Sequence, residues 1–287
     1  MIKIFLVCCA LFFIYPSESY GADDSLWRKL DLTNTVLLSL PQGKVVIELA
    51  PSFAPKHVTQ FSQLIKQDFY NSTKFYRVID GFVAQAGPQD GSDKDKSVDT
   101  LAIEAEKSIT KEWLFTSVQD KDLFAEKTGF KNSFAMATNT LEGKAWLTHC
   151  PGVIAMARGN EADSATSHFY FVIGQAPRYL DRIMTVFGRV VYGMQHIQAI
   201  QRTAVIAGDN AIDPQDFTTI ISMQLMSEVA KAEQLLIEVE NTNSSVFIER
   251  LNKRRAREGA FFYKKPPPIL DVCQIPLRSR RVKISTM

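Results

Sequence analysis

Short apolar runs separated by turn dipeptides dominate the first two thirds of the chain. Residues 36–40 and 44–49 read as two strands around the turn Pro41-Gln42-Gly43. The spacing then becomes helical over residues 54–66, where Val58 and Phe61 fall on one face together with apolar residues one turn later. This pattern predicts a mainly β domain carrying a small number of helices.

Two further strands, residues 75–79 and 82–86, flank the turn dipeptide Asp80-Gly81. Strand alternation predicts that Phe75, Arg77 and Ile79 share one face of the first strand. A guanidinium between two apolar neighbours needs an acceptor. Taken alone, Arg77 has two interpretations, an ion pair with a distant carboxylate or a functional cation. Downstream, residues 171–174, 185–191 and 218–225 read as strands, and residues 194–200 as a second helix.

Several blocks of sequence occur in a characteristic order: residues 75–87, 152–160, 163–173, 179–181 and 185–194. Together they closely resemble the cyclophilin family of peptidyl-prolyl isomerases. The resemblance covers residues 37–226 and is interrupted by one long insertion. It implies a closed eight-stranded antiparallel barrel capped by two helices, to which this chain adds a C-terminal helical extension.

The resemblance also implies roles for individual residues. Arg77, Phe82 and Gln85 match the catalytic arginine, the phenylalanine of the proline pocket and the glutamine that holds the substrate backbone. The remaining matched substrate-binding positions are Val83, Ala157, Arg158, His168, Tyr170, Tyr179, Leu180 and Met184. Four of these depart from the family's common residues, namely His168, Tyr170, Tyr179 and Met184. The departures put in question the peptide preference and the affinity for a cyclosporin-type ligand.

The implied activity is cis-trans isomerisation of X-Pro bonds by transition-state stabilisation, with proline-containing segments as substrates. Twisting the amide crosses a barrier of roughly 18–20 kcal/mol. The twisted proline nitrogen carries a lone pair that Arg77 can bind. A different class of function is a proline-peptide binding module or chaperone, in which the altered pocket residues have removed turnover. In a third class of function, the basic C-terminus binds a membrane or a partner and the barrel serves as its scaffold.

Other chemistries find little support in the residues. The four histidines have no short metal-ligand spacing, and the chain has neither a CxxC pair nor an HExxH box, so we expect no metal and no cofactor. Ser164 and His168 lie close in sequence but lack the GxSxG turn of a hydrolase. A formal net charge of +2 predicts no nucleic-acid partner.

The first 21 residues resemble a secretory signal peptide, with a basic start at Lys3 and an apolar core over residues 4–15. We therefore expect an exported protein, periplasmic rather than in the endoplasmic reticulum lumen or secreted, because the signal is short and no retention motif ends the chain. After cleavage Cys150 and Cys273 remain, and an even pair in an exported protein suggests a disulfide. Two buried free thiols are the competing interpretation.

The expected organisation is a signal peptide at residues 1–21, an isomerase domain at 22–228 with an insertion at about 88–151, and an extension at 229–287. Large aromatic residues in the insertion, among them Phe130 and Trp146, predict an ordered excursion that either borders the peptide groove or is a passive surface feature. In the extension, Ser245 is expected to cap a helix bearing Phe247. The basic residues that follow would either contact a membrane surface or an acidic partner, or form a solvated face packed through Phe247 and Phe261, and composition favours the latter.

Overall fold

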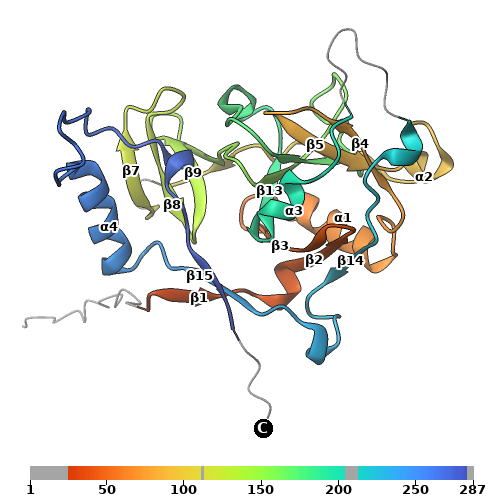
Figure 1. Ribbon diagram of the computed structural model, residues 1–287. Helices are drawn as coiled ribbons and strands as arrows, with labels where there is room; N and C mark the ends of the chain where they lie inside the picture. The colour runs from red at the N-terminus through yellow and green to blue at the C-terminus, as the bar shows by residue number, and fades with distance from the viewer. Residues whose placement is uncertain (1–24, 111–112, 204–212, 283–287) are drawn as a thin grey trace, which may run out of the picture.

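A computed structural model describes residues 25–110, 113–203 and 213–282. Its largest element is an eight-stranded antiparallel sheet with the strand order β14-β2-β3-β13-β11-β12-β5-β4 (Figure 1). The strands are β2 (Thr35–Leu40), β3 (Gly43–Leu49), β4 (Lys74–Val78), β5 (Val83–Gly87), β11 (Val153–Met156), β12 (Phe169–Val172), β13 (Val186–Tyr192) and β14 (Ser222–Leu225). The predicted mainly β architecture is therefore present, and each strand expected from the sequence has its counterpart within a few residues.

The sheet curls into an open half-barrel, and the complete closure that we expected is not formed. Its edge strands β4 and β14 meet through a single bridge between Lys74 and Thr219. Two backbone bonds reinforce it, from the Phe75 amide to the Thr218 carbonyl at 2.9 Å and from the Ile220 amide to the Thr73 carbonyl at 2.8 Å. The segment before β14 leaves strand geometry here, so the seam has no continuous ladder.

The half-barrel encloses an apolar core that also receives the helix α1 (Pro55–Lys66). Phe61 of α1 is fully buried and packs edge to face on Phe169 and Phe187, with ring centroids 5.5 and 4.9 Å away. The second predicted barrel helix, α3 (Met194–Gln198), is shorter than expected. The amphipathic spacing read from the sequence thus selects the face of α1 that fills the barrel.

The N-terminus of α1 is capped by a residue from the insertion. Ala54 precedes the helix and provides no side-chain cap. Instead, the Glu104 carboxylate accepts the amides of Lys56 and His57 at 3.1 and 3.0 Å and also contacts His57 Nδ1 at 2.8 Å. A carboxylate at this position satisfies free amides and complements the helix dipole.

The described residues of the insertion, 88–110 and 113–151, form regular structure, as predicted, in two parts. A short helix, α2 (Asp93–Lys96), lies beside β4 and β5 (Figure 1). The remainder forms a five-stranded antiparallel sheet with the order β6-β10-β9-β8-β7. Its strands are β6 (Lys107–Ser108), β7 (Thr116–Asp120), β8 (Lys127–Lys131), β9 (Phe134–Asn139) and β10 (Lys144–Leu147).

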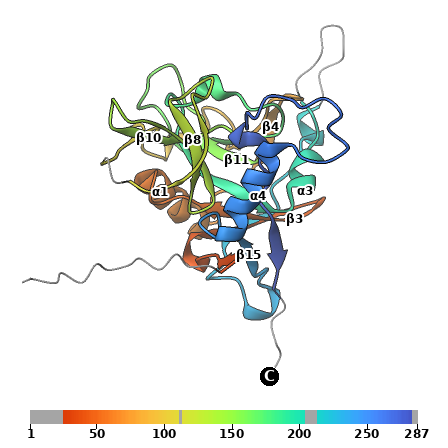
Figure 2. The same cartoon turned by 90° about the vertical axis from the view of Figure 1, so that its left-hand side faces the viewer.

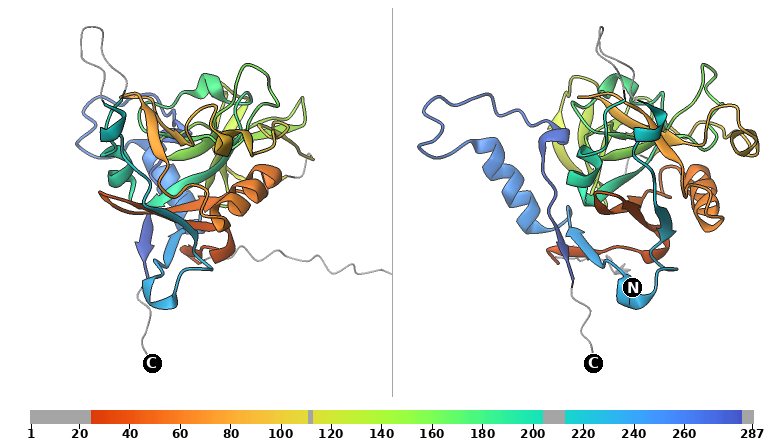
Figure 3. Two further views of the ribbon diagram at one scale, coloured as in Figure 1. Left: turned by 90° about the vertical axis from the view of Figure 1, so that its right-hand side faces the viewer. Right: turned by 45° about the vertical axis from the view of Figure 1, so that its right-hand side comes forward.

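The C-terminal extension covers this second sheet but is not helical as a whole. Its one α-helix within the described residues is α4 (Ser245–Ala256), which lies against β8 (Figure 2) with the Phe247 ring 5.5 Å from that of Phe130. The cap is Ser244, not Ser245 as predicted, because the Ser244 side chain accepts the Phe247 amide. Phe247 is fully buried as expected, whereas Phe261 is 88% exposed on a loop that projects from the molecule (Figure 3).

The extension also joins the N-terminal part of the chain. A three-stranded antiparallel sheet combines β1 (Trp27–Lys29), β15 (Ile237–Glu240) and β16 (Ser279–Arg281), with β15 in the middle. The side chain of Glu240 is fully buried and pairs with Arg250 and Arg278 at 2.6 and 2.5 Å. Several basic residues of the extension therefore serve structural ion pairs.

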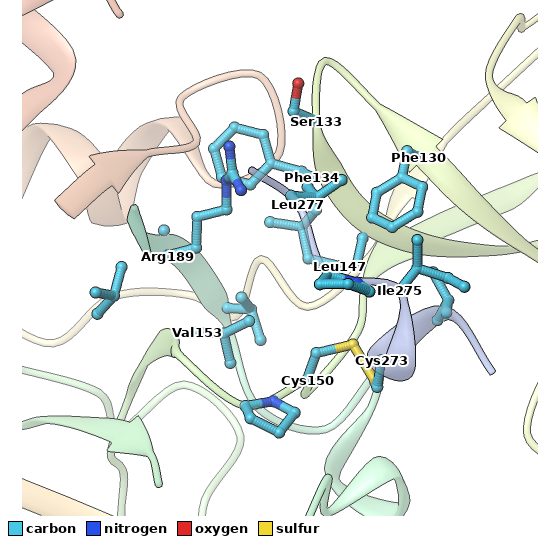
Figure 4. Close-up of a pocket in the computed structure, with 17 residues that line it drawn as sticks. Phe130, Ser133, Phe134, Leu147, Cys150, Val153, Arg189, Cys273, Ile275 and Leu277 are labelled. Atoms are coloured by element: carbon cyan, nitrogen blue, oxygen red, sulfur yellow. A yellow bond between two sulfur atoms is a disulfide. The ribbon is translucent and has the colours of Figure 1, made fainter. Parts of the chain in front are cut away.

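The predicted disulfide is confirmed: Cys150 and Cys273 are bonded. Together with Phe130, Leu147 and Ile275 they line a cavity of about 220 Å³ between the second sheet, β13 and the extension (Figure 4). The bond thus fixes the extension to the segment that enters β11. Within residues 25–110, 113–203 and 213–282, no helix has the length and apolar character needed to cross a membrane. The predicted signal peptide lies outside the described residues.

Candidate active site

Strands β4 and β5 place the three central residues side by side. Arg77 is the register partner of Gln85, and Gln85 is in turn the partner of Tyr170 on β12. The expected alternation along β4 is wrong, because a bulge lies between Phe75 and Arg77. Phe75 and Val78 are consequently buried in the core, whereas Tyr76 and Arg77 both reach Gln85. A bulge of this kind redirects side chains without ending the strand pairing.

The Arg77 guanidinium is exposed and held from two sides. Its Nη1 donates to Gln85 Oε1 at 3.2 Å, and its Cζ lies 5.9 Å from the centroid of the Phe82 ring. Within the described residues, no carboxylate forms an ion pair with Arg77, so the ion-pair interpretation is not the one the structure adopts. A cation positioned in this way keeps donors available for a ligand.

An apolar wall stands next to this cation. Val83, Ala157 and Tyr170 are buried, and Phe82 and Met184 are partly buried against the same cluster. Leu180 closes the short 3₁₀ helix η2 (Arg178–Leu180), and its carbonyl accepts the Met184 amide at 3.2 Å. Tyr179, by contrast, is 65% exposed. The structure therefore brings most of the predicted pocket residues together and leaves Tyr179 at the rim.

The hydroxyl of Tyr170 forms a buried hydrogen bond inside the protein. Its oxygen lies 3.0 Å from Nε2 of the buried His149, whose Nδ1 lies 3.0 Å from Asp181 Oδ1. Arg178 donates in turn to the second carboxylate oxygen of Asp181 and, at 3.1 Å, to Asp122 of the insertion. Burial raises the pKa of Tyr170 well above 10.0, so the hydroxyl stays protonated. A tyrosine can thus occupy this wall position without leaving an unpaired hydroxyl.

The remaining predicted residues border a hollow of about 540 Å³ beside Gln85, lined by Ala157, Arg158 and His168. The Arg158 guanidinium donates to the carbonyls of Ile183, Gly159 and Asn160. Its side chain therefore holds the loop, which leaves the backbone of Ala157 and Arg158 as the predicted peptide-binding element. Asp90 and Asp95 of the insertion also line this hollow, so the insertion borders the site.

Comparison with known proteins assigns the family. A family model described as cyclophilin type peptidyl-prolyl cis-trans isomerase/CLD matches residues 35–224. The chain belongs to the cyclophilin family. Its activity is accordingly that of a peptidyl-prolyl cis-trans isomerase, and cyclophilins bind proline-containing peptides.

Individual cyclophilins show how far the similarity extends. A probable peptidyl-prolyl cis-trans isomerase of Brucella suis is 33% identical over 172 residues, which cover 60% of this chain and 74% of that protein. An isomerase of Acinetobacter baylyi is 28% identical over 203 residues, covering 68% and 88%. The crystal structure of the cyclophilin AquaCyp293 from Hirschia baltica superposes with a TM-score of 0.72 at 26% identity, covering 93% of this chain and 97% of that one. The last match extends into the insertion and the extension of this cyclophilin.

Sequence reasoning missed four residues that the structure brings to the site: Tyr76, Asp95, His149 and Asp181. Regular strand alternation predicts that Tyr76 lies on the face opposite Arg77, and the bulge that overrides it has no signature in the apolar pattern. Asp95 lies in the insertion, for which the resemblance offered no template. His149 has no local sequence signal, because its ring contacts residues 21 and 32 positions away.

Proposed function

We propose that this cyclophilin isomerises X-Pro bonds of other exported proteins and so assists their folding. The observation that carries the proposal is the exposed Arg77 guanidinium, which is fixed by Gln85 and Phe82 next to an apolar wall. A pyrrolidine ring seated against Phe82 and Met184 would bring the proline nitrogen within reach of the guanidinium. Gln85 would hold the peptide backbone on the other side.

The chemistry is differential binding. Rotation about the X-Pro bond pyramidalises the proline nitrogen, and a hydrogen-bond donor binds the resulting lone pair more tightly than the planar amide. Arg77 acts as a hydrogen-bond donor throughout and transfers no proton in this mechanism. No bond to the enzyme forms, and the apolar wall excludes water that would otherwise compete for Arg77.

Export is supported by the secretory pattern of residues 1–21 and by the Cys150–Cys273 disulfide, since such bonds persist in oxidising compartments. The proposal places the mature protein in a periplasm. Cell fractionation of the full chain and of a variant lacking residues 2–21 tests it. Equal distribution of the two proteins between the compartments would contradict it.

Exchange spectroscopy on a short X-Pro peptide tests the enzymatic proposal. Replacing Arg77 by alanine should lower kcat/KM by about 100-fold or more, as loss of a transition-state donor typically does. The matched control is Arg281→Ala, which removes an exposed arginine of the three-stranded sheet. An Arg77→Ala protein with full activity would refute the assigned role. A folded wild type that binds the peptide without turning it over would instead identify a binding module.

A further inference from the structure

A chain of four hydrogen bonds connects Arg77 to the insertion. Arg77 Nη1 donates to Gln85 Oε1 at 3.2 Å, and Gln85 Nε2 donates to the Tyr76 hydroxyl at 2.6 Å. The Tyr76 hydroxyl lies 2.8 Å from His168 Nδ1. His168 Nε2 lies 2.8 Å from Asp95 Oδ1 on α2.

The direction of every bond in this chain follows from its two ends. An ionised carboxylate only accepts, so Asp95 requires the proton of a neutral His168 ring to be on Nε2. His168 Nδ1 must then accept, and the Tyr76 hydroxyl donates to it. The lone pairs of that hydroxyl accept from the Gln85 amide nitrogen, which turns Oε1 of Gln85 toward Arg77.

Tyr76 and Asp95 are in the protonation states that this order of hydrogen bonds needs. Burial raises the pKa of Tyr76 to about 12, so its hydroxyl keeps the proton that it donates. Burial raises the pKa of Asp95, but the hydrogen bonds from the Gly91 amide and His168 outweigh this effect, and the net pKa is below 3.8. Asp95 is therefore an anion at neutral pH.

The His168 ring fills a space that is free because residue 87 is a glycine. A Cβ atom at Gly87 would collide with the ring at Nδ1, so glycine is required where β5 ends. The ring also meets Tyr76 edge to face, with centroids 5.6 Å apart. Both ring nitrogens of His168 are engaged by the protein, and its substrate-binding role stays a prediction.

We propose that Asp95, His168 and Tyr76 are positioning residues that set the orientation of the Gln85 amide and, through it, of Arg77. The inference rests on the proposed role of Arg77 in isomerisation. A Gln85 amide has two orientations of nearly equal shape, and only one presents an acceptor to the guanidinium. The flipped amide would place two donors face to face and displace Arg77 from its position over Phe82.

The consequence is that the insertion contributes to catalysis through Asp95, which acts on Arg77 by way of other side chains. Asp95 belongs to α2, whose Ser92 cap and Gly91 amide, the latter bonded to Asp95 Oδ2 at 2.9 Å, hold the carboxylate in place. The oxygen of Asp95 that contacts His168 is separated from Arg77 by three intervening side chains. Because each of those side chains fixes the direction of the next hydrogen bond, the charge of the Asp95 carboxylate influences how Arg77 is held.

The test combines kinetics with the tautomer of His168. Tyr76→Phe removes the hydroxyl that anchors Gln85, and Asp95→Ala removes the acceptor that fixes the tautomer. Each should lower kcat/KM by about tenfold, the effect expected from one lost hydrogen bond to a positioned group. The matched controls are Tyr263→Phe, 97% exposed, and Asp93→Ala, an exposed carboxylate of the same helix. Both should retain wild-type activity.

Nitrogen-15 spectra of the His168 ring provide a readout that a general loss of stability would not produce. At slightly alkaline pH the wild type should carry its proton on Nε2, and Asp95→Ala should convert this to a mixture of tautomers. A wild-type proton on Nδ1 would overturn the proposal. So would a fully active Tyr76→Phe protein alongside an inactive Arg77→Ala protein, a result that leaves the proposed function intact. An active Arg77→Ala protein would instead remove both.

Discussion

The Cys150–Cys273 disulfide closes a loop with a sequence separation of 123 residues, and its reduction should cost a large part of the protein's stability. The loop contains β11, β12 and β13, and with them Ala157, Tyr170 and Met184 of the apolar wall. Chain-entropy arguments assign to a loop of this length about 5 kcal/mol at 25 °C, because the cross-link restricts the unfolded chain. Reduction leaves both side chains in place, so packing in the folded state changes little.

The assay is urea unfolding of oxidised and fully reduced protein, followed by tryptophan fluorescence and far-ultraviolet circular dichroism. With an m value of about 3 kcal/mol/M, the midpoint of the reduced protein should be lower by roughly 1.7 M urea. The matched control is the double variant Cys150→Ala and Cys273→Ala, whose midpoint the reductant should not move.

Equal midpoints and slopes for oxidised and reduced wild type would refute this reasoning. The apolar cluster around the bond, which includes Phe130 and Leu147, would then hold the extension against β11 without help from the cross-link. The stabilisation would have to be assigned to native packing, and the entropy of the unfolded loop would not be its source.

Three further predictions concern packing and charge. Phe247→Ala should lower the free energy of unfolding by about 3–5 kcal/mol because it empties a fully buried site between α4 and β8, whereas Phe261→Ala should stay within about 0.5 kcal/mol in the same urea titration. Burial holds the pKa of His57 below 6.5, so the unfolded chain binds more protons at this residue and the free energy of unfolding should fall as the pH drops below that value. Between about pH 7.5 and about pH 5.5, the wild type should lose more unfolding free energy than His57→Asn, which keeps a donor for Glu104. Equal losses in the two proteins would contradict this. Glu240→Gln should cost about 2 kcal/mol by calorimetry, since it removes the charge that two partly solvated arginines share, and an unchanged melting temperature would show that the pair is not stabilising.

The apolar pattern was sufficient to locate the strands of the half-barrel except β11, and the buried face of α1. Both depend on local alternation, which burial of one face imposes directly on the sequence. The residues quoted for the family resemblance likewise located Arg77, Phe82 and Gln85, because they lie within 9 positions on two adjacent strands. The disulfide followed from cysteine number and the expected compartment.

Tertiary structure decided what lies around those residues. A bulge in β4, invisible to the apolar pattern, turns Tyr76 toward Gln85. Asp95 and His149 join the site across 73 and 21 residues of chain, respectively, from their partners His168 and Tyr170. Such contacts leave no periodic trace, because hydrogen bonds join single atoms at positions that only the folded backbone brings together. Sequence alone thus indicated most strands of the half-barrel and the central cation, and the fold specified how that cation is held.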